Sequence, residues 1–194
     1  GQDFDASPDL CRIVNDRHFQ RLAGLLEDAV SRGAKVAFGG AMDASKRFMA
    51  PTLLTGVTSE MLVMQEEIFG PLLPVLSYDR KEDALAIIQA RPKPLAMYVF
   101  SRSRENSDDW IRRTSSGSTV VNHLLIQAGV NTHLPFGGVG GSGMGRSVGK
   151  AGFESFSNPR SVIEQPTGFG DFARSTFPPY SPLFQRMIHW LFGA

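Results

Sequence analysis

Apolar positions alternate along the chain between helical spacing and short continuous runs. One stripe at intervals of three and four predicts a helix that starts at Asn15 or Asp16 and ends at Gly33. Its apolar face is formed by Phe19, Leu22, Leu26, Ala29 and Val30. A second helix is expected from Asp79, with Glu82 completing a capping box, to the prolines at 92 and 94. A third is expected from Ser103 through Thr114, with Trp110 and Ile111 facing inward.

Five short apolar runs predict strands at residues 35–38, 52–57, 72–78, 95–100 and 118–122. Strands that alternate with helices favour an α/β fold around a parallel sheet with right-handed crossovers.

Composition and charge argue against several classes of function for this chain. The 20 Lys and Arg residues balance 19 Asp and Glu residues without forming a basic block, so no nucleic-acid partner is expected. The apolar runs are far shorter than the ~20 residues that span a bilayer. Cys11 is the one cysteine, which suits a reducing compartment, and a cytoplasmic location is expected. The four histidines lack metal-ligand spacing, so no metal is expected. Because residue 1 is Gly, we expect the numbering to open inside a longer protein or after a cleaved tag.

The segment LPFGGVGGSGMGR, residues 134–146, satisfies the dinucleotide pattern G-x-G-x-x-G at 138–143, and Glu164 follows at a suitable distance. However, Leu134–Phe136 is a poor strand, and Gly149, Gly152 and Pro159 leave too little room for the helix that a true fingerprint opens. We therefore interpret it as a packed loop whose backbone passes close to other segments, or as a mobile wall beside a ligand.

The segment MQEEIFGP, residues 64–71, reads locally as a solvated turn with Phe69 anchored in the core. Together with RPKPLAMYVFS, TSSGSTVVN and the glycine loop, it closely resembles the C-terminal part of the aldehyde dehydrogenase superfamily. The likeness is greatest to the fatty and aromatic aldehyde branch, which includes coniferyl aldehyde dehydrogenases. It extends from about Ser7 to about Gln165.

This resemblance implies an incomplete portion of a parallel-sheet α/β catalytic domain over residues 1–165, followed by a tail at 166–194 with an amphipathic helix. It implies that Glu67 accepts hydrogen bonds from the nicotinamide ribose hydroxyls of NAD or NADP, and that Phe69 packs against that ribose and ring. A carboxylate suits a vicinal diol, and an aromatic face limits where the nicotinamide can lie. Glu66 has no assigned role.

The resemblance also places the glycine loop near the substrate tunnel and the subunit contacts. It implies that Leu125, His133 and Phe136 help to line the aldehyde tunnel. The alternative that His123 and His133 are only polar loop residues stays open.

The family's cysteine nucleophile, its oxyanion donors and its water-activating glutamate lie N-terminal to the matched region, so no catalytic residue is expected here. Cys11 precedes the first helix and is expected to be a small, half-buried residue. The intact enzyme is expected to be a homodimer that oxidises an apolar aldehyde, aromatic such as coniferyl or long-chain, to its acid through a cysteine thioester. The alternatives are an acylating, coenzyme A-dependent enzyme, or a non-catalytic assembly or binding module.

The tail carries a helical stripe of Phe184, Met187, Ile188 and Leu191. Three interpretations remain open. The favoured one is a helix docked on its own or a partner subunit. Attachment to a membrane surface is not expected, because Arg186 and His189 supply little positive charge. A lid over the aldehyde entrance is suggested by the resembled branch.

Overall fold

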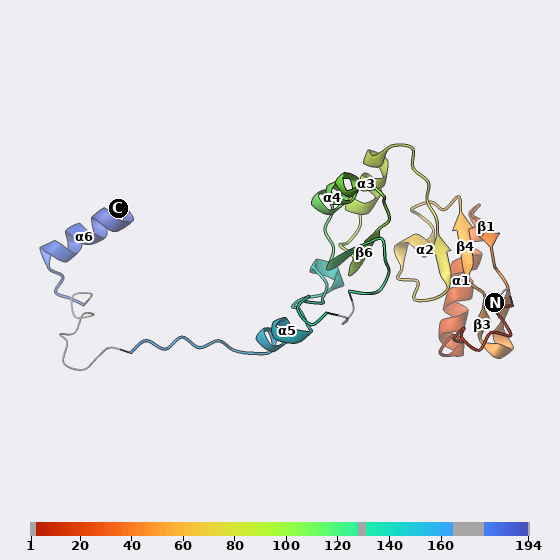
Figure 1. The fold of residues 1–194 in the computed structure, drawn as a ribbon, viewed down its shortest axis with the longest axis horizontal. Coiled ribbons are helices and arrows are strands. Elements are labelled where there is room, and N and C mark those ends of the chain that lie inside the picture. Colours follow the sequence, from red (N-terminus) through yellow and green to blue (C-terminus); the bar gives the residue numbers. More distant parts are fainter. Residues whose placement is uncertain (1–2, 128–130, 165–176, 194) are drawn as a thin grey trace. The chain divides into compact units, whose positions relative to one another are not determined.

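The computed structural model describes residues 3–127, 131–164 and 177–193 (Figure 1). The chain forms two compact units. One comprises the residues up to 93 together with 103–115, and the other comprises 94–102 with the residues from 116 onward. The predicted boundary at residue 165 lies outside the described residues and stays a prediction.

The first unit is built on a three-stranded sheet in the order β1-β4-β5, comprising β1 (Lys35–Phe38), β4 (Thr52–Thr55) and β5 (Leu72–Pro74). Strands β4 and β5 are parallel, with Thr52 opposite Leu72. Strand β1 is antiparallel to β4, which departs from the all-parallel expectation. The link between them holds only a small hairpin of β2 (Met42–Asp43) and β3 (Phe48–Met49) around the 3-10 turn η1 (Ala44–Lys46). A parallel pairing would need a longer crossover, usually a helix.

Helix α1 (Asp16–Ser31) forms where the sequence predicts it. The Asn15 side chain caps it by accepting from the His18 amide at 2.8 Å, and Gly33 follows its end with a φ of +102°. Val30, placed on the apolar face by the sequence, is instead 46% exposed. The buried face packs into one core with residues of β3, β4 and β5, among them Leu22, Leu26, Met49, Leu54 and Leu72.

The first unit also contains α2 (Leu62–Gln65), α3 (Lys81–Gln89) and α4 (Arg104–Arg113). Ser103 caps α4 as predicted, accepting from the Asn106 amide at 3.1 Å. The predicted capping box of α3 is wrong. Its N-cap is Arg80, which makes no side-chain capping bond, because the helix begins later than expected. Trp110 is half-buried with Lys81 Nζ 4.9 Å from its ring centroid, whereas Ile111 is 42% exposed.

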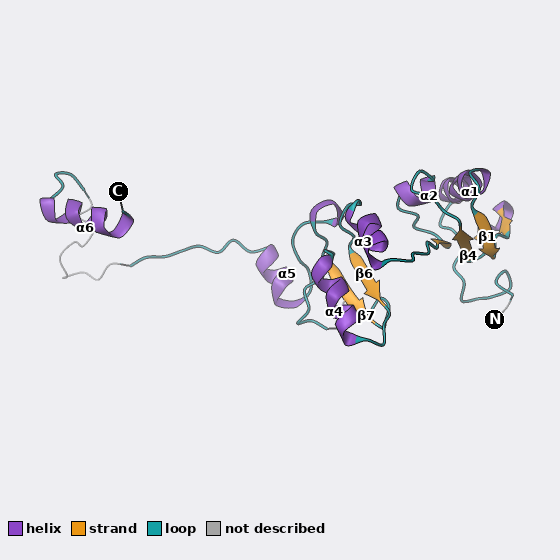
Figure 2. Cartoon of the chain, turned by 90° about the horizontal axis from the view of Figure 1, so that it is seen from above, coloured by secondary structure: helices purple, strands orange, loops and turns teal. Residues whose placement is uncertain are grey.

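The second unit contains a parallel pair, β6 (Ala96–Val99) and β7 (Ser118–Val121), which lie side by side (Figure 2). The glycine-rich segment follows, with the 3-10 turn η2 (Gly140–Ser142) and the helix α5 (Gly149–Ser155). The tail helix is confirmed as α6 (Pro182–Phe192), capped by Ser181. None of its side chains is buried, and Trp190 is 83% exposed. Among the described helices, none has both the length and the apolar character needed to cross a membrane.

Candidate functional site

The turn formed by residues 66–70 connects α2 to β5 and presents two side chains outward. Glu67 is exposed, and the Phe69 side chain is 79% exposed on a residue with a φ of +48°. The local interpretation that anchored Phe69 in the core is therefore wrong. Ile68, between them, packs instead against the core cluster. The turn thus partly buries its middle residue, Ile68, and directs the side chains of Glu67 and Phe69 to solvent.

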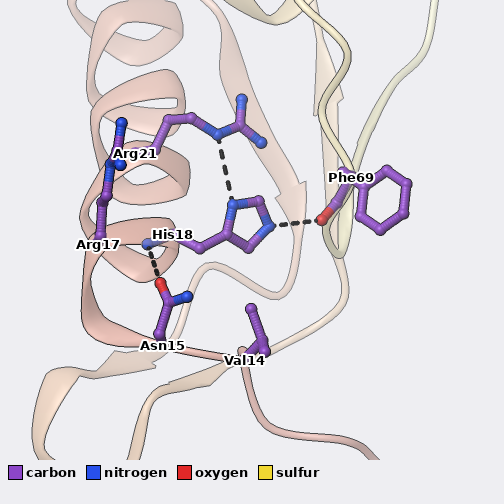
Figure 3. Close-up of a pocket in the computed structure, with 6 residues that line it drawn as sticks. All are labelled: Val14, Asn15, Arg17, His18, Arg21 and Phe69. Atoms are coloured by element: carbon purple, nitrogen blue, oxygen red, sulfur yellow. Dashed lines mark hydrogen bonds between the residues drawn. The ribbon is translucent and has the colours of Figure 1, made fainter.

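Two side chains of α1 contact the main chain of this turn, and Figure 3 shows the contact made by His18. The ring nitrogen Nε2 of His18 lies 2.8 Å from the Phe69 carbonyl oxygen. The guanidinium of Arg21 donates to the carbonyl of Glu67 at 3.2 Å and to that of Ile68. It also lies 3.5 Å from the Glu66 carboxylate. Three successive carbonyls of the turn are therefore hydrogen-bonded to one helix.

Helix α1 also holds α2, the short helix that precedes the turn. Asp28 of α1 accepts a hydrogen bond from the Leu62 amide at 2.8 Å, at the first residue of α2. That bond lowers the pKa of Asp28, against the opposing effect of desolvation, and the hydrogen bond from Arg32 lowers it further. Helix α1 therefore fixes both α2 and the 66–70 turn.

Gly70 allows the turn to lie close to α1. A Cβ at this position would be 2.5 Å from Leu22 Cδ2, and Leu22 is fully buried, so its side chain has no room to move away. We expect Gly70→Ala to lower the free energy of unfolding of the protein by roughly 1–3 kcal/mol through overpacking.

Denaturant unfolding measures this effect, with Gly24→Ala as the matched control. Gly24 is an exposed residue of α1, and a Cβ there meets nothing within 4 Å. The control should stabilise the helix by about 0.5–1 kcal/mol. Equal stabilities for the two variants would contradict the close packing of the turn on Leu22.

The outward groups of the turn suit one end of a nicotinamide cofactor. Within the described part of the chain, no hydrogen bond to the Glu67 carboxylate is found. Both of its oxygens are therefore available to a vicinal diol. The exposed Phe69 ring borders an open hollow of about 560 Å³ whose other walls are Val14, Asn15, Arg17, His18 and Arg21. An exposed aromatic face beside an exposed carboxylate fits a ribose and its attached flat ring.

The expected tunnel residues lie in the second unit. Leu125 is 72% exposed with a φ of +62°, and His133 is also exposed. Phe136 is half-buried, and its amide and carbonyl pair with Ser147 at 3.0 and 2.7 Å. Phe136 thereby becomes part of the glycine loop, and no hydrogen bond joins it to Leu125 or His133 among the described residues. Their role in a tunnel stays a prediction.

The glycine loop is a packed loop and not a dinucleotide fingerprint, as the sequence indicated. Phe136 forms an isolated bridge in place of a strand, and α5 has only seven residues. A Cβ on Gly138 would lie 2.0 Å from the Ser142 carbonyl oxygen. The Arg146 side chain crosses the loop and donates to the carbonyls of Gly138 and Gly145.

Within the described residues, neither a cysteine nucleophile nor a metal site finds support. Cys11 is exposed in the coil before α1, so the expected half-buried position is wrong. In residues 3–127, 131–164 and 177–193, no group of three or more His, Cys, Asp or Glu side chains could hold a metal ion. Sequence reasoning missed the roles of His18 and Arg21. Their spacing of three along α1, beside the buried Phe19 and Leu22, is the signal that could have found them.

Comparison with known proteins identifies relatives of this chain. A model described as the aldehyde dehydrogenase family matches residues 1–162. A cattle protein (Bos taurus), "Aldehyde dehydrogenase, dimeric NADP-preferring", is 44% identical over 183 residues, which cover 94% of this chain and 74% of that protein. A Staphylococcus aureus protein, "4,4'-diaponeurosporen-aldehyde dehydrogenase", is 43% identical over 185 residues, which cover 95% of this chain and 39% of that protein.

Among solved structures, the substrate-bound state of Staphylococcus aureus AldH superposes with a TM-score of 0.85 and 41% sequence identity. The match covers 98% of this chain and 40% of that one. The chain therefore spans about two fifths of the length of both Staphylococcus aureus proteins.

Proposed function

Because this chain belongs to the aldehyde dehydrogenase family, we propose that the whole protein oxidises an apolar aldehyde to its carboxylic acid with NAD or NADP. The observation that carries the proposal is the 66–70 turn, which presents the Glu67 carboxylate and the Phe69 ring to solvent while α1 holds its main chain.

Each group of the turn has a distinct task in this proposal. Glu67 accepts hydrogen bonds from the two hydroxyls of the nicotinamide ribose, and its negative charge strengthens both bonds. Phe69 packs against the ribose and ring and restricts where the ring can lie. When bound, the nicotinamide accepts the hydride removed from the aldehyde carbon. The cysteine nucleophile that forms the thioester is proposed to lie outside this chain, since Cys11 occupies exposed coil before α1.

The relatives support the finer parts of the proposal. The Staphylococcus aureus relative is named for 4,4'-diaponeurosporen aldehyde, which agrees with an aldehyde substrate. That the substrate is long-chain, or aromatic such as coniferyl aldehyde, is proposed from the sequence resemblance. The cattle relative is named dimeric and NADP-preferring, which agrees with a homodimer and keeps NADP beside NAD. Leu125, His133 and Phe136 are proposed as walls of the aldehyde tunnel. The cytoplasmic location stays a prediction from the sequence.

Steady-state assays of the whole protein test the substrate class and the product. We expect kcat/KM for decanal or coniferaldehyde to exceed that for acetaldehyde at least ~10-fold, because each buried methylene contributes about 0.8 kcal/mol. The control is the same assay with coenzyme A added, in which the free acid should remain the product. A preference for acetaldehyde would contradict the apolar substrate, and an acyl-coenzyme A product would favour the acylating alternative.

A further inference from the structure

We propose that Arg21 and His18 are positioning residues of the cofactor site, which act on the cofactor through the main chain of the 66–70 turn. This inference rests on the proposed function, because it assigns to these residues the task of setting the directions of the Glu67 carboxylate and the Phe69 ring.

The two side chains bind different carbonyls of the turn. They lie three residues apart on α1, so both project from one side of the helix toward the turn (Figure 3). The planar fork of Arg21 reaches two successive carbonyls, those of Glu67 and Ile68. His18 reaches the next one, that of Phe69. The three carbonyls therefore face α1, and the side chains of Glu67 and Phe69 are left on the solvent side.

Holding this main chain matters because Phe69 has an unusual conformation. Its φ of +48° lies in the left-handed region, which bulky L residues seldom adopt. The β4–β5 pairing does not include the carbonyls of residues 67–69, because its first hydrogen bond runs from the Thr52 amide to the Pro71 carbonyl and its register begins at Leu72. Together with the packing of Ile68 and Gly70, the hydrogen bonds from His18 and Arg21 therefore hold the main chain of residues 67–69 in this conformation. The Arg21–Glu66 ion pair contributes little, since 33% and 49% of the two side chains are exposed.

The test uses the whole protein and measures the Kd for NADH and NADPH by fluorescence titration, apart from turnover. We expect Arg21→Gln to raise the Kd about 5- to 20-fold, which is around and below the lower end of what lost hydrogen bonds to a charged group cost, because the effect reaches the cofactor only through the turn. Arg21→Lys should recover only part of the lost affinity, because one ammonium group cannot replace a planar guanidinium that binds two carbonyls. His18→Ala should also weaken binding, and His18→Gln should restore it by supplying a side-chain donor.

Arg104→Gln is the matched control. It makes the same change on another helix, α4, at a side chain that is 95% exposed and lies 3.8 Å from Asp108. Its removal should change the Kd less than about 2-fold, as is typical of surface substitutions. Glu66→Gln should behave in the same way, which would separate the ion pair from the carbonyl contacts. If Arg21→Gln binds cofactor as Arg104→Gln does, the inference is overturned.

A double-mutant cycle separates positioning from direct contact. If Arg21 acts through the turn, combining Arg21→Gln with Glu67→Gln should weaken binding little more than the larger single effect. Effects that multiply would mean that Arg21 touches the cofactor itself, and would overturn the inference. Hydrogen exchange of the cofactor-free protein gives a second readout. The Glu66 amide, which donates to the Leu62 carbonyl at the start of the turn, should exchange faster in Arg21→Lys, which is used if Arg21→Gln does not fold, and should be unchanged in Arg104→Gln.

The outcomes also distinguish this inference from the proposed function. Unaltered exchange of the turn in both Arg21 variants, with normal binding by the wild type, would overturn the positioning role alone. A wild-type protein that binds neither NADH nor NADPH would overturn the proposed function and the inference with it.

Discussion

We expect the 194-residue chain by itself to show no NAD- or NADP-dependent oxidation of aldehydes. Thioester chemistry needs a thiolate held beside the aldehyde and activated by its surroundings. The chain's one cysteine, Cys11, is an exposed residue in coil, ahead of the helix that holds the 66–70 turn. The expected effect is complete, because without a nucleophile no covalent intermediate forms, even if Glu67 and Phe69 bind the cofactor as proposed.

The measurement is NADH or NADPH formation by the purified chain, with the whole protein as positive control under the same conditions. Circular dichroism and light scattering establish whether the chain is folded and how it assembles. A folded chain without turnover would agree with this account and also with the binding-module alternative for the isolated chain. Turnover that disappears in Cys11→Ser would show that the nucleophile has been assigned wrongly.

The second large effect is expected for Glu67→Gln in the whole protein. The amide keeps the size of the side chain but loses the negative charge that strengthens acceptance from the ribose hydroxyls. A loss of roughly 1–3 kcal/mol corresponds to a rise of about 5- to 150-fold in the Kd for the cofactor. The hydride step should slow as well, because the ring is held less firmly, whereas the melting temperature should stay the same.

Glu66→Gln is the control for this prediction, since it makes the same carboxylate-to-amide change at the adjacent exposed residue. It should leave cofactor binding within about 2-fold of the wild type. If the two variants bind NADH and NADPH equally well, Glu67 is an ordinary surface acid and the site must be sought elsewhere.

Helices whose ends are marked by nearby capping residues were predicted correctly from the sequence. Helix α1 combines a continuous apolar stripe with the Asn15 cap, and α4 has the Ser103 cap, so both were found within one or two residues. The glycine loop was rejected as a dinucleotide site because its flanks lack a strand and a long helix, and the structure agrees. Family motifs then named Glu67 and Phe69, which lie together on one turn.

Features that depend on contacts between distant segments of the chain could not be predicted from local sequence patterns. The antiparallel pairing of β1 follows from how residues 39–51 return to the sheet, which no local pattern encodes. The exposure of Phe69 depends on Ile68 entering the core and on Gly70 packing against Leu22. The bonds of His18 and Arg21 join residues more than forty positions apart along the chain. Such contacts exist only once α1 has packed on the sheet.

The most direct test of the cofactor site is a crystal structure of the whole protein with NAD or NADP bound. The account predicts both hydroxyls of the nicotinamide ribose within hydrogen-bond distance of the Glu67 carboxylate, and the Phe69 ring packed against that ribose and the nicotinamide. It also predicts that His18 and Arg21 still contact the carbonyls of residues 67–69. A cofactor whose ribose lies away from Glu67, with the 66–70 turn facing solvent, would contradict it.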